Sequence, residues 1–414
     1  MSFVSYPPDV DSTRYDSKGV EVIQLNSAFA EQMVITPSPQ WQQSFEYTVS
    51  NTQLNKIEIS GSATVTQANA MAVVSTGTTA SSEAMLRSTH HARYKAGFGG
   101  IARFSAMFTA PVAATFQYAG LMDEHGAVVE FVNGYAIGFN GTDATVARFQ
   151  NDALFEVLQA NWDDPLDGSG ASGVTLDFTK LNVFYIQYQY LGAGPIYFWT
   201  EHPTTGVPFR FHTMTYGNAN TVPSTYNPNY HMTFYADNLA TTSDLIVSTA
   251  SYGYFVEGPT ELVEFHQPQF TSGTVQKTGI TTEVAIMSIR SKATYAGKIN
   301  YIDILIERFA SSIEAGAANN LGTVRVVKNA TLGGTPVWND VNTTDSIMEE
   351  DIAGTTVTGG DEITTYPLAG KNDKDVENVI PYKLIVHPGD MITISGTSAA
   401  SATIRAAVLW KELF

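Results

Sequence analysis

The sequence predicts an all-β protein with a jelly-roll-like β-sandwich followed by a second β-sandwich and preceded by an N-terminal arm. Apolar and polar residues alternate with a period of two along most of the chain, which is typical of half-buried strands. Short strand patterns are separated by turns rich in Gly, Asn and Pro. Of the 414 residues only 15% are charged and 11% are aromatic, and 33 are glycine. This composition favours an extended β-protein over a helical one.

Residues 1–80 are expected to form the N-terminal arm, with short strands. In the pattern around residue 47, Phe45, Tyr47 and Val49 share one face. Pro7-Pro8 and Pro37-Ser38-Pro39 indicate extended connectors. The small polar segment 73–82 is expected to be a loop or linker.

Residues 81–257 are expected to form the central jelly-roll-like sandwich, because their strand patterns are longer and more aromatic. Ala102, Phe104, Ala106 and Phe108 alternate with polar or larger residues. Phe184, Ile186 and Tyr188 form one predicted face, and Gln187 points the other way. The Gly-rich turn 191–195 then predicts a hairpin. Such closely spaced strands are typical of two-sheet sandwiches.

Residues 258–414 are expected to form the second sandwich. Ile302, Ile304 and Ile306 alternate in one strand pattern, and Pro388-Gly389 suits the centre of a type II turn. The last pattern places Ile404, Ala406, Val408 and Trp410 on one face. We therefore expect the C-terminus to be packed into the core.

Charge and cysteine content exclude several classes of protein. The 22 basic and 40 acidic residues give a net charge of −18, which opposes binding of nucleic acid over a broad surface. A chain without cysteine has neither disulfides nor a cysteine-ligated zinc site. The N-terminus has no signal-peptide pattern, and no apolar run is long enough to span a membrane. A virion component assembled in the host cytoplasm fits this combination.

Several aromatic residues are expected outside the core, either opposite the core rows or in loops. Tyr185, Tyr197, Trp199 and Tyr216 are the candidates for contact with a glycan or a partner. Flat aromatic faces bind sugar rings, and Tyr and Trp are also frequent in protein interfaces. Packing between subunits is the first interpretation, and glycan binding is the second.

The segment from Ala84 to Ala110 contains four Lys and Arg residues and no acidic residue. It suggests a basic contact patch for an anion, an acidic glycan or an acidic neighbouring subunit; a charged sheet edge is the alternative. The candidate residues are Arg87, His90, His91, Arg93 and Lys95. The stretch 340–377 holds ten acids and two bases, 2 − 10 = −8. We expect these opposite charges to meet between neighbouring copies, in a contact that high salt weakens.

Asp163, Asp164 and Asp167 lie in the Gly-rich loop NWDDPLDGSGASG. Their hard oxygen ligands suit Ca²⁺, but the spacing does not match an EF-hand loop. An acidic turn without a metal is the default expectation, and calcium is the weaker one.

No catalytic residue is predicted, and we expect the protein not to be an enzyme. The chain has no nucleophile elbow, zinc-protease motif or P-loop. Asp123-Glu124-His125 and Glu201-His202 are compact acid–histidine groups, but turn residues follow each of them. Neighbouring side chains on a strand also diverge, so neither group predicts a catalytic pair.

Three runs resemble a β-rich module in structural proteins of tailed phages and large DNA viruses, namely capsid-decoration, fibre or tail proteins. They are STGTTASSEAMLRSTHHARYKAGFGGIARFSAMF (75–108), GYAIGFNGT (134–142) and FYIQYQYLGAGPIYFW (184–199). The segment 286–306 and the terminal WKELF resemble the second β-domain found with it. The resemblance implies a surface, fibre or tail component that is commonly homo-oligomeric.

The leading hypothesis is therefore a virion structural protein that self-associates as a trimer and contacts other virion proteins and the host. One alternative is a carbohydrate-binding adhesin or lectin-like module, whose partner would be a host-surface glycan. A second is a capsid lattice protein, and a less favoured one is a polysaccharide-degrading spike enzyme.

Overall fold

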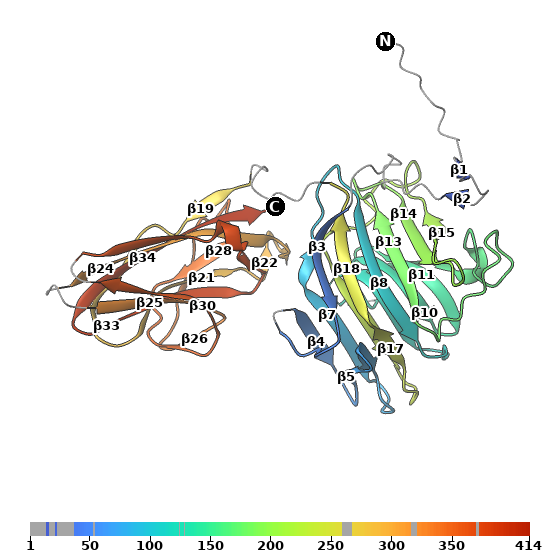
Figure 1. The fold of residues 1–414 in the computed structure, drawn as a ribbon, viewed down its shortest axis with the longest axis horizontal. Helices are drawn as coiled ribbons and strands as arrows, with labels where there is room; N and C mark the ends of the chain where they lie inside the picture. Colours follow the sequence, from blue (N-terminus) through green and yellow to red (C-terminus); the bar gives the residue numbers. More distant parts are fainter. Residues whose placement is uncertain are drawn as a thin grey trace, which may run out of the picture. The chain divides into compact units, whose positions relative to one another are not determined.

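The computed structural model describes residues 14–15, 21–22, 37–52, 54–123, 125–127, 129–258, 267–315, 321–369 and 372–414. The chain is all-β and divides into two compact units, Met1–Thr260 and Glu261–Phe414 (Figure 1). Within the described residues the only helical turns are the short 3₁₀ segments η1 (Gln159–Asn161) and η2 (Ile380–Tyr382). Over the same residues, no helix has the length and apolar character that crossing a membrane requires.

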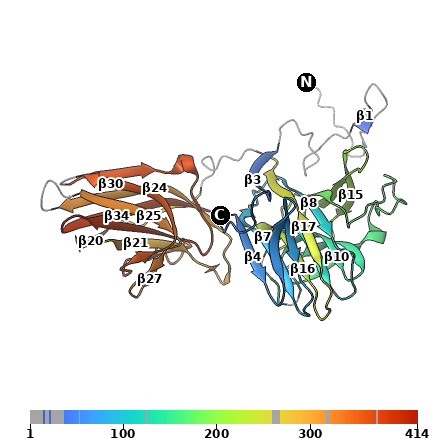
Figure 2. The ribbon, with the colours of Figure 1, turned by 60° about the horizontal axis from the view of Figure 1, so that its bottom comes forward.

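The described residues of the first unit form two large sheets, and a turned view shows the two layers (Figure 2). The seven-stranded sheet has the order β12 (Leu154–Leu158), β11 (Asp143–Phe149), β10 (Gly134–Asn140), β9 (Phe116–Met122), β16 (Tyr230–Asp237), β7 (Glu83–Ala92), β4 (Asn55–Ile59). The nine-stranded sheet has the order β15 (Pro208–Met214), β14 (Ile196–Glu201), β13 (Asn182–Tyr188), β8 (Gly100–Phe108), β17 (Ile246–Thr249), β6 (Met71–Ser75), β5 (Thr64–Ala68). Strand β18 (Ser251–Val256) also pairs with β8, and β3 (Ser38–Ser44) pairs with β18.

Alternation along the strands builds the core between these sheets. On β8 the predicted face, Ala102 to Phe108 in steps of two, is buried in one apolar cluster. On β13 the cluster receives Phe184, Ile186 and Tyr188. The intervening residues of β8 and β13 therefore face away from the core. That outward face is where the candidate site lies.

From residue 37 onward, the described part of the expected arm belongs to this sandwich, whereas β1 (Arg14–Tyr15) and β2 (Glu21–Val22) pair only with each other. Strand β3 pairs with β18, β4 with β7, and β6 with β17. The chain therefore divides after Thr260, close to the expected boundary at 257, but not at residue 80. Tyr47 is 92% exposed although Phe45 and Val49 are buried, because the alternating pattern ends with β3. The arm prediction differs from the structure because these pairings join segments far apart in sequence.

The second unit is also a sandwich in its described residues. One sheet has the order β19 (Gln269–Thr271), β34 (Ala402–Leu413), β24 (Asp303–Ala315), β31 (Lys374–Asn378), with β20 (Val275–Ile280) beside β34 and β32 (Ile385–Val386) beside β24. The other has the order β27 (Trp338–Asp340), β28 (Met348–Asp351), β21 (Val284–Ser291), β33 (Met391–Ser398), β25 (Leu321–Lys328), β30 (Asp361–Ala369).

Three short strand pairs complete the described secondary structure. They are β1 (Arg14–Tyr15) with β2 (Glu21–Val22), β22 (Thr294–Tyr295) with β23 (Lys298–Ile299), β26 (Thr331–Leu332) with β29 (Val357–Thr358). The packed C-terminus is confirmed, since every second residue of β34 from Ile404 to Trp410 is buried.

Candidate functional site

The outward face of the nine-stranded sheet carries a row of aromatic and basic side chains. Arg103 on β8 lies opposite Tyr185 on β13, Tyr185 lies opposite Trp199 on β14, and Trp199 lies opposite Arg210 on β15. Directly opposed residues point to the same face of a sheet, so the four side chains form one row. Because adjacent strands lie ~4.8 Å apart, the row extends over about 14 Å.

A register shift between Phe198 and Trp199 helps to build this row. Phe198 and Phe211 are both buried in the core, whereas Arg210 is exposed. An extra residue on one strand of a pair bends it and re-aims its side chains. The shift therefore lets β15 keep Phe211 inside while Arg210 joins the outward row.

Arg103 is held between two rings. Its guanidinium carbon lies 5.4 Å from the ring centroid of Tyr185 and 5.0 Å from that of Phe255 on β18. Such cation–π contacts stabilise a cation where water is partly excluded. Its Nε atom is buried without an acceptor, and Arg103 forms no ion pair with any residue that the structure describes.

A groove with a volume of about 660 Å³ lies beside Arg103 on this face. Gly253 faces Arg103 across the strand pair, and a Cβ at Gly253 would lie 3.1 Å from a ring carbon of Phe255. The missing side chain therefore leaves room for the ring of Phe255. Polar and aromatic side chains line the groove, among them Gln42, Ser44, Arg103, Ser105, Tyr185 and Phe255.

Further polar contacts hold the ring positions. The guanidinium of Arg210 lies 5.3 Å from the ring centroid of Tyr197. The hydroxyl of Tyr185 donates to Glu201, and Gln187 donates to Glu257 at 2.7 Å. Burial, together with the nearby Glu201, raises the pKa of Tyr185, so this hydroxyl stays a donor at neutral pH. The indole Nε1 of Trp199 is buried without an acceptor among the described residues.

The structure brings three of the four predicted aromatic residues together on this face: Tyr185, Tyr197 and Trp199. Tyr216 lies elsewhere and is only 5% exposed, with its hydroxyl bonded to the carbonyl of Val222 at 2.8 Å. The expectation that Tyr216 is an accessible contact residue is therefore wrong. Burial of a loop aromatic depends on the fold around it, which periodicity does not describe.

Arg103 is the fourth basic residue of the segment 84–110, but the sequence did not single out Arg103, Arg210 or Phe255 as a candidate site residue. Arg103 and Phe255 each alternate with buried residues on their strands, so an outward position was detectable. Their neighbours were not, because register across strands is set by tertiary pairing.

The predicted basic patch is not a continuous surface feature. Arg87 is 1% exposed and pairs with Glu58 at 2.6 Å, and the ring of buried His91 lies 4.0 Å from that of His231. The expectation of a contact patch is wrong for Arg87 and His91, because β7 is an inner strand between β16 and β4. The remaining candidates, His90, Arg93 and Lys95, are partly exposed.

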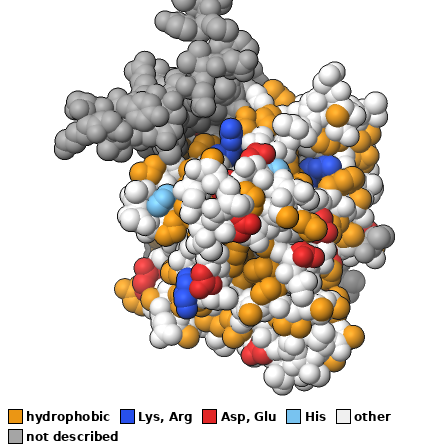
Figure 3. Space-filling model, turned by 90° about the vertical axis from the view of Figure 1, so that its right-hand side faces the viewer, with side chains coloured by type: hydrophobic (Ala, Val, Ile, Leu, Met, Phe, Trp, Pro, Cys, Tyr) orange, Lys and Arg blue, Asp and Glu red, His pale blue; other side chains and the backbone are white. Residues whose placement is uncertain are grey.

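On one side of the first unit, charged side chains are few, and basic and acidic ones lie side by side in places among apolar and uncharged polar ones (Figure 3). No broad cationic surface is visible on the part of this side that the structure describes.

The three loop aspartates organise the backbone separately. Asp163 accepts from the backbone N–H of Thr213 at 2.9 Å, and Asp164, 5% exposed, accepts from Leu166 and Ser172. Asp167 accepts from Ser169. Over the described ranges, their carboxylates do not form a group of ligand atoms close enough to share one ion. The calcium expectation therefore gains no support from this geometry.

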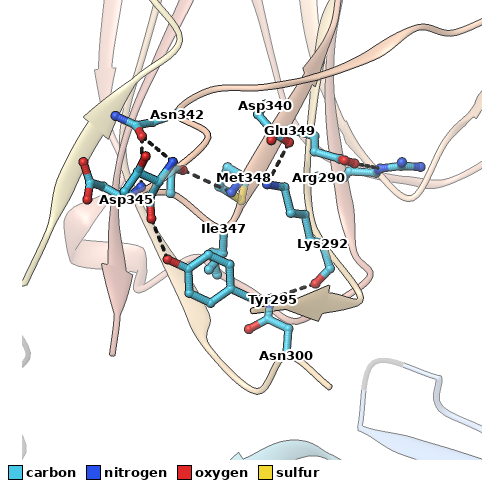
Figure 4. A network of polar contacts seen from close by, with 12 residues as sticks. Arg290, Lys292, Tyr295, Asn300, Asp340, Asn342, Asp345, Ile347, Met348 and Glu349 are labelled. Atoms are coloured by element: carbon cyan, nitrogen blue, oxygen red, sulfur yellow. Dashed lines mark hydrogen bonds and ion pairs between the residues drawn. The ribbon is translucent and has the colours of Figure 1, made fainter. Parts of the chain in front are cut away.

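The start of the acidic stretch is used inside the second unit (Figure 4). Asp340 pairs with Lys292 at 2.7 Å, and Glu349 pairs with Arg290 at 2.7 Å. Asp351, 1% exposed, accepts from the backbone N–H groups of Val337, Ala353 and Gly354. These acids therefore hold neighbouring strands and the loops beside them together, which reduces the charge left for another copy.

The acid–histidine groups also serve local structure. Asp123 is buried and binds Asn133, and His125 pairs with Glu83 at 2.8 Å. Glu124 lies outside the described residues. His202 accepts from the backbone N–H of Thr204, which closes the turn after Glu201.

No family model matches the chain, and no curated protein matches it by sequence. Among solved structures, it resembles an endo-acting O-glycanase of the human gut microbiota, with 9% identity over 53% of this chain and 99% of that chain and a TM-score of 0.37. A β-1,3-glucanase from Mycobacterium marinum has 9% identity over 53% of this chain and 100% of its own, with a TM-score of 0.35. Lectin UEA-II complexed with galactose has 9% identity over 53% of this chain and 99% of its own, with a TM-score of 0.33. At such identities and scores, these likenesses concern the β-sandwich fold alone.

Proposed function

We propose that the first unit binds carbohydrate on the outward face of its nine-stranded sheet and does not transform it. The supporting observation is that rings from adjacent strands lie together beside a groove: Tyr185, Tyr197, Trp199 and Phe255. A sugar offers an apolar ring face and hydroxyl groups at its edges. Aromatic faces suit the first, and a few placed polar groups suit the second.

The same face supplies both kinds of contact. Gln42, Ser44 and Ser105 line the groove with hydrogen-bonding groups, and Arg103 adds donors. Apolar side chains exposed singly are ordinary on a protein surface, whereas several rings side by side are not. Here rings alternate with polar groups along the strands, which favours a ligand with the same mixed character.

Binding without turnover agrees with how the carboxylates are placed. Glycoside hydrolysis uses two carboxyl groups on opposite sides of the scissile bond. On this face, Glu201 accepts from Tyr185 and Glu257 accepts from Gln187, so both carboxylates already serve to position side chains. The prediction that the protein is not an enzyme therefore remains part of the proposal.

A glycan array followed by calorimetric titration with the full chain tests this function. Trp199→Ala should weaken binding of any glycan that the array identifies by about tenfold or more, as loss of a central aromatic contact does. Tyr226→Ala is the matched control, since Tyr226 is 48% exposed in the same unit, does not line the groove, and donates its backbone N–H to Asn133, which precedes β10 of the other sheet. Absence of any bound glycan, or equal affinity of the wild type and Trp199→Ala, would refute the proposal.

The virion setting remains a proposal from the sequence. A particle component can contact its host through host or capsule glycans, so the two proposals are compatible. Mass spectrometry of purified particles would detect the chain and its copy number, and sedimentation would test the expected trimer. A chain absent from particles, or a stable monomer at micromolar concentration, would contradict the virion and trimer predictions respectively.

A further inference from the structure

We propose that the groove beside Arg103 selects sugars that carry a carboxylate, so that the bound glycan contains uronic-acid or similar acidic residues. This inference rests on the proposed function and adds the class of ligand. It comes from a cation that the fold places beside the groove without giving it an anionic partner.

Two aromatic rings hold Arg103 in place beside the groove. It lines the groove, and its contacts to described residues are the ring faces of Tyr185 and Phe255. Both rings restrict the guanidinium, so it loses little further freedom when a ligand binds. A guanidinium presents its donors in a planar fork that matches the two oxygens of a carboxylate. Arg103 is thus prepared for an anion of that shape.

Along the row that includes Arg103, hydrogen-bond donors outnumber acceptors. Arg103 has a buried Nε without an acceptor, and Trp199 in the same row has a buried Nε1 without one. Arg210, at the end of the row, contacts the ring of Tyr197 and pairs with no carboxylate in the described chain. The row therefore has more donors than acceptors. The buried Nε and Nε1 atoms are out of a ligand's reach, but Arg103 also lines the groove, and a carboxylate, which only accepts, complements its guanidinium better than a hydroxyl, which also donates.

The two carboxylates on this face bind side chains other than Arg103. Glu201 and Glu257 accept hydrogen bonds from Tyr185 and Gln187, and neither forms an ion pair with Arg103. A carboxylate of the ligand would therefore not have to displace an internal partner. With a net charge of −18, the protein repels an acidic glycan at long range, so selection must come from contact.

The test uses one oligosaccharide in two forms: a uronic-acid oligomer, and the same oligomer after its carboxyl groups are reduced to alcohols. Calorimetric titration of the full chain at 150 mM salt measures both affinities. The wild type should bind the acidic form about 10- to 100-fold more tightly, the range that a hydrogen bond to a charged group supplies.

Two variants separate contact from overall charge. Arg103→Gln keeps donors but removes the charge, so it should bind the acidic form only as well as the reduced form. Its affinity for the reduced form should fall much less than its affinity for the acidic form, and an unchanged melting temperature shows that the variant folds. Arg308→Gln is the matched control, because Arg308 is exposed on the second unit and has no ion pair among the described residues. It should keep the wild-type preference.

The outcomes distinguish this inference from the function on which it rests. Equal affinity for both forms, with both lost in Trp199→Ala, would overturn the acidic specificity and leave carbohydrate binding intact. An equal loss in Arg103→Gln and Arg308→Gln would attribute the preference to net charge and would also overturn it. Binding of neither form by a protein that binds no glycan on an array would overturn the proposed function itself.

Discussion

Replacement of Glu412 by alanine should strongly destabilise the second unit. Glu412 is fully buried near the end of β34. Its carboxylate accepts from the hydroxyl of Ser346, from the backbone N–H of Ile347 at 3.0 Å and from the indole N–H of Trp410 at 3.2 Å. One buried side chain thus connects the last strand to the loop before β28.

The magnitude follows from the donors that the substitution leaves unpaired. The hydroxyl of Ser346 can rotate, but the two N–H groups cannot, and each buried donor without an acceptor costs ~1–3 kcal/mol. Glu412→Ala should therefore lower the free energy of unfolding by about 2–6 kcal/mol, a large share of the roughly 5–15 kcal/mol of a typical domain. Glu412→Gln keeps an acceptor oxygen and should cost only about 1–2 kcal/mol.

Differential scanning calorimetry of the full chain measures this effect on the transition of the second unit. Glu314→Ala is the control, since Glu314 lies on the neighbouring β24 with a side chain 58% exposed and pairs with Arg405 at 2.9 Å. Such a surface pair is worth roughly 0–1 kcal/mol. If Glu412→Ala shifts the transition no more than Glu314→Ala does, the reasoning about buried donors is refuted.

Three further predictions concern the first unit. Burial raises the pKa of Glu130 above 4.5 and that of Asp237 above 3.8, and a hydrogen bond to Glu83 raises the pKa of His125 above 6.5. Folding favours the protonated form of all three, so their contribution is complete below the unfolded values and is lost as pH rises through the folded ones. The melting temperature of the wild type relative to that of Glu130→Gln should thus fall as pH rises above about 4.5; a difference that grows with pH would contradict the assignment. Asp164→Ala should lower the free energy of unfolding by about 1–3 kcal/mol, because the N–H groups of Leu166 and Ser172 lose their acceptor. A chelator should leave the melting temperature of the wild type unchanged; a fall in that temperature would restore the calcium hypothesis. Arg148→Met should lower the free energy of unfolding in urea by about 2–4 kcal/mol, because buried Arg148 donates to Gln150 at 2.9 Å and to the carbonyl of Ser224 at 2.7 Å. A decrease below about 0.5 kcal/mol would show that the apolar part of the side chain alone is sufficient for stability.

Local alternation was sufficient to predict which residues of several strands face the core. The rows on β8, β13 and β34 are buried as their patterns indicate, and Tyr185 and Trp199 lie on the opposite side. This works because the side-chain period of a strand is two whatever its neighbours are. The all-β fold class follows from the same regularity and from composition.

Pairing between distant strands decided the rest. Strand β6 lies beside β17, β7 lies between two strands, and Arg103 shares a row with Trp199 and Arg210 only after three strands align. These relations bury Arg87 and assemble the candidate site. The sequence by itself determined strand faces, fold class and several outward aromatic residues. Tertiary structure alone decided their neighbours, because strand register depends on contacts between segments that are remote along the chain.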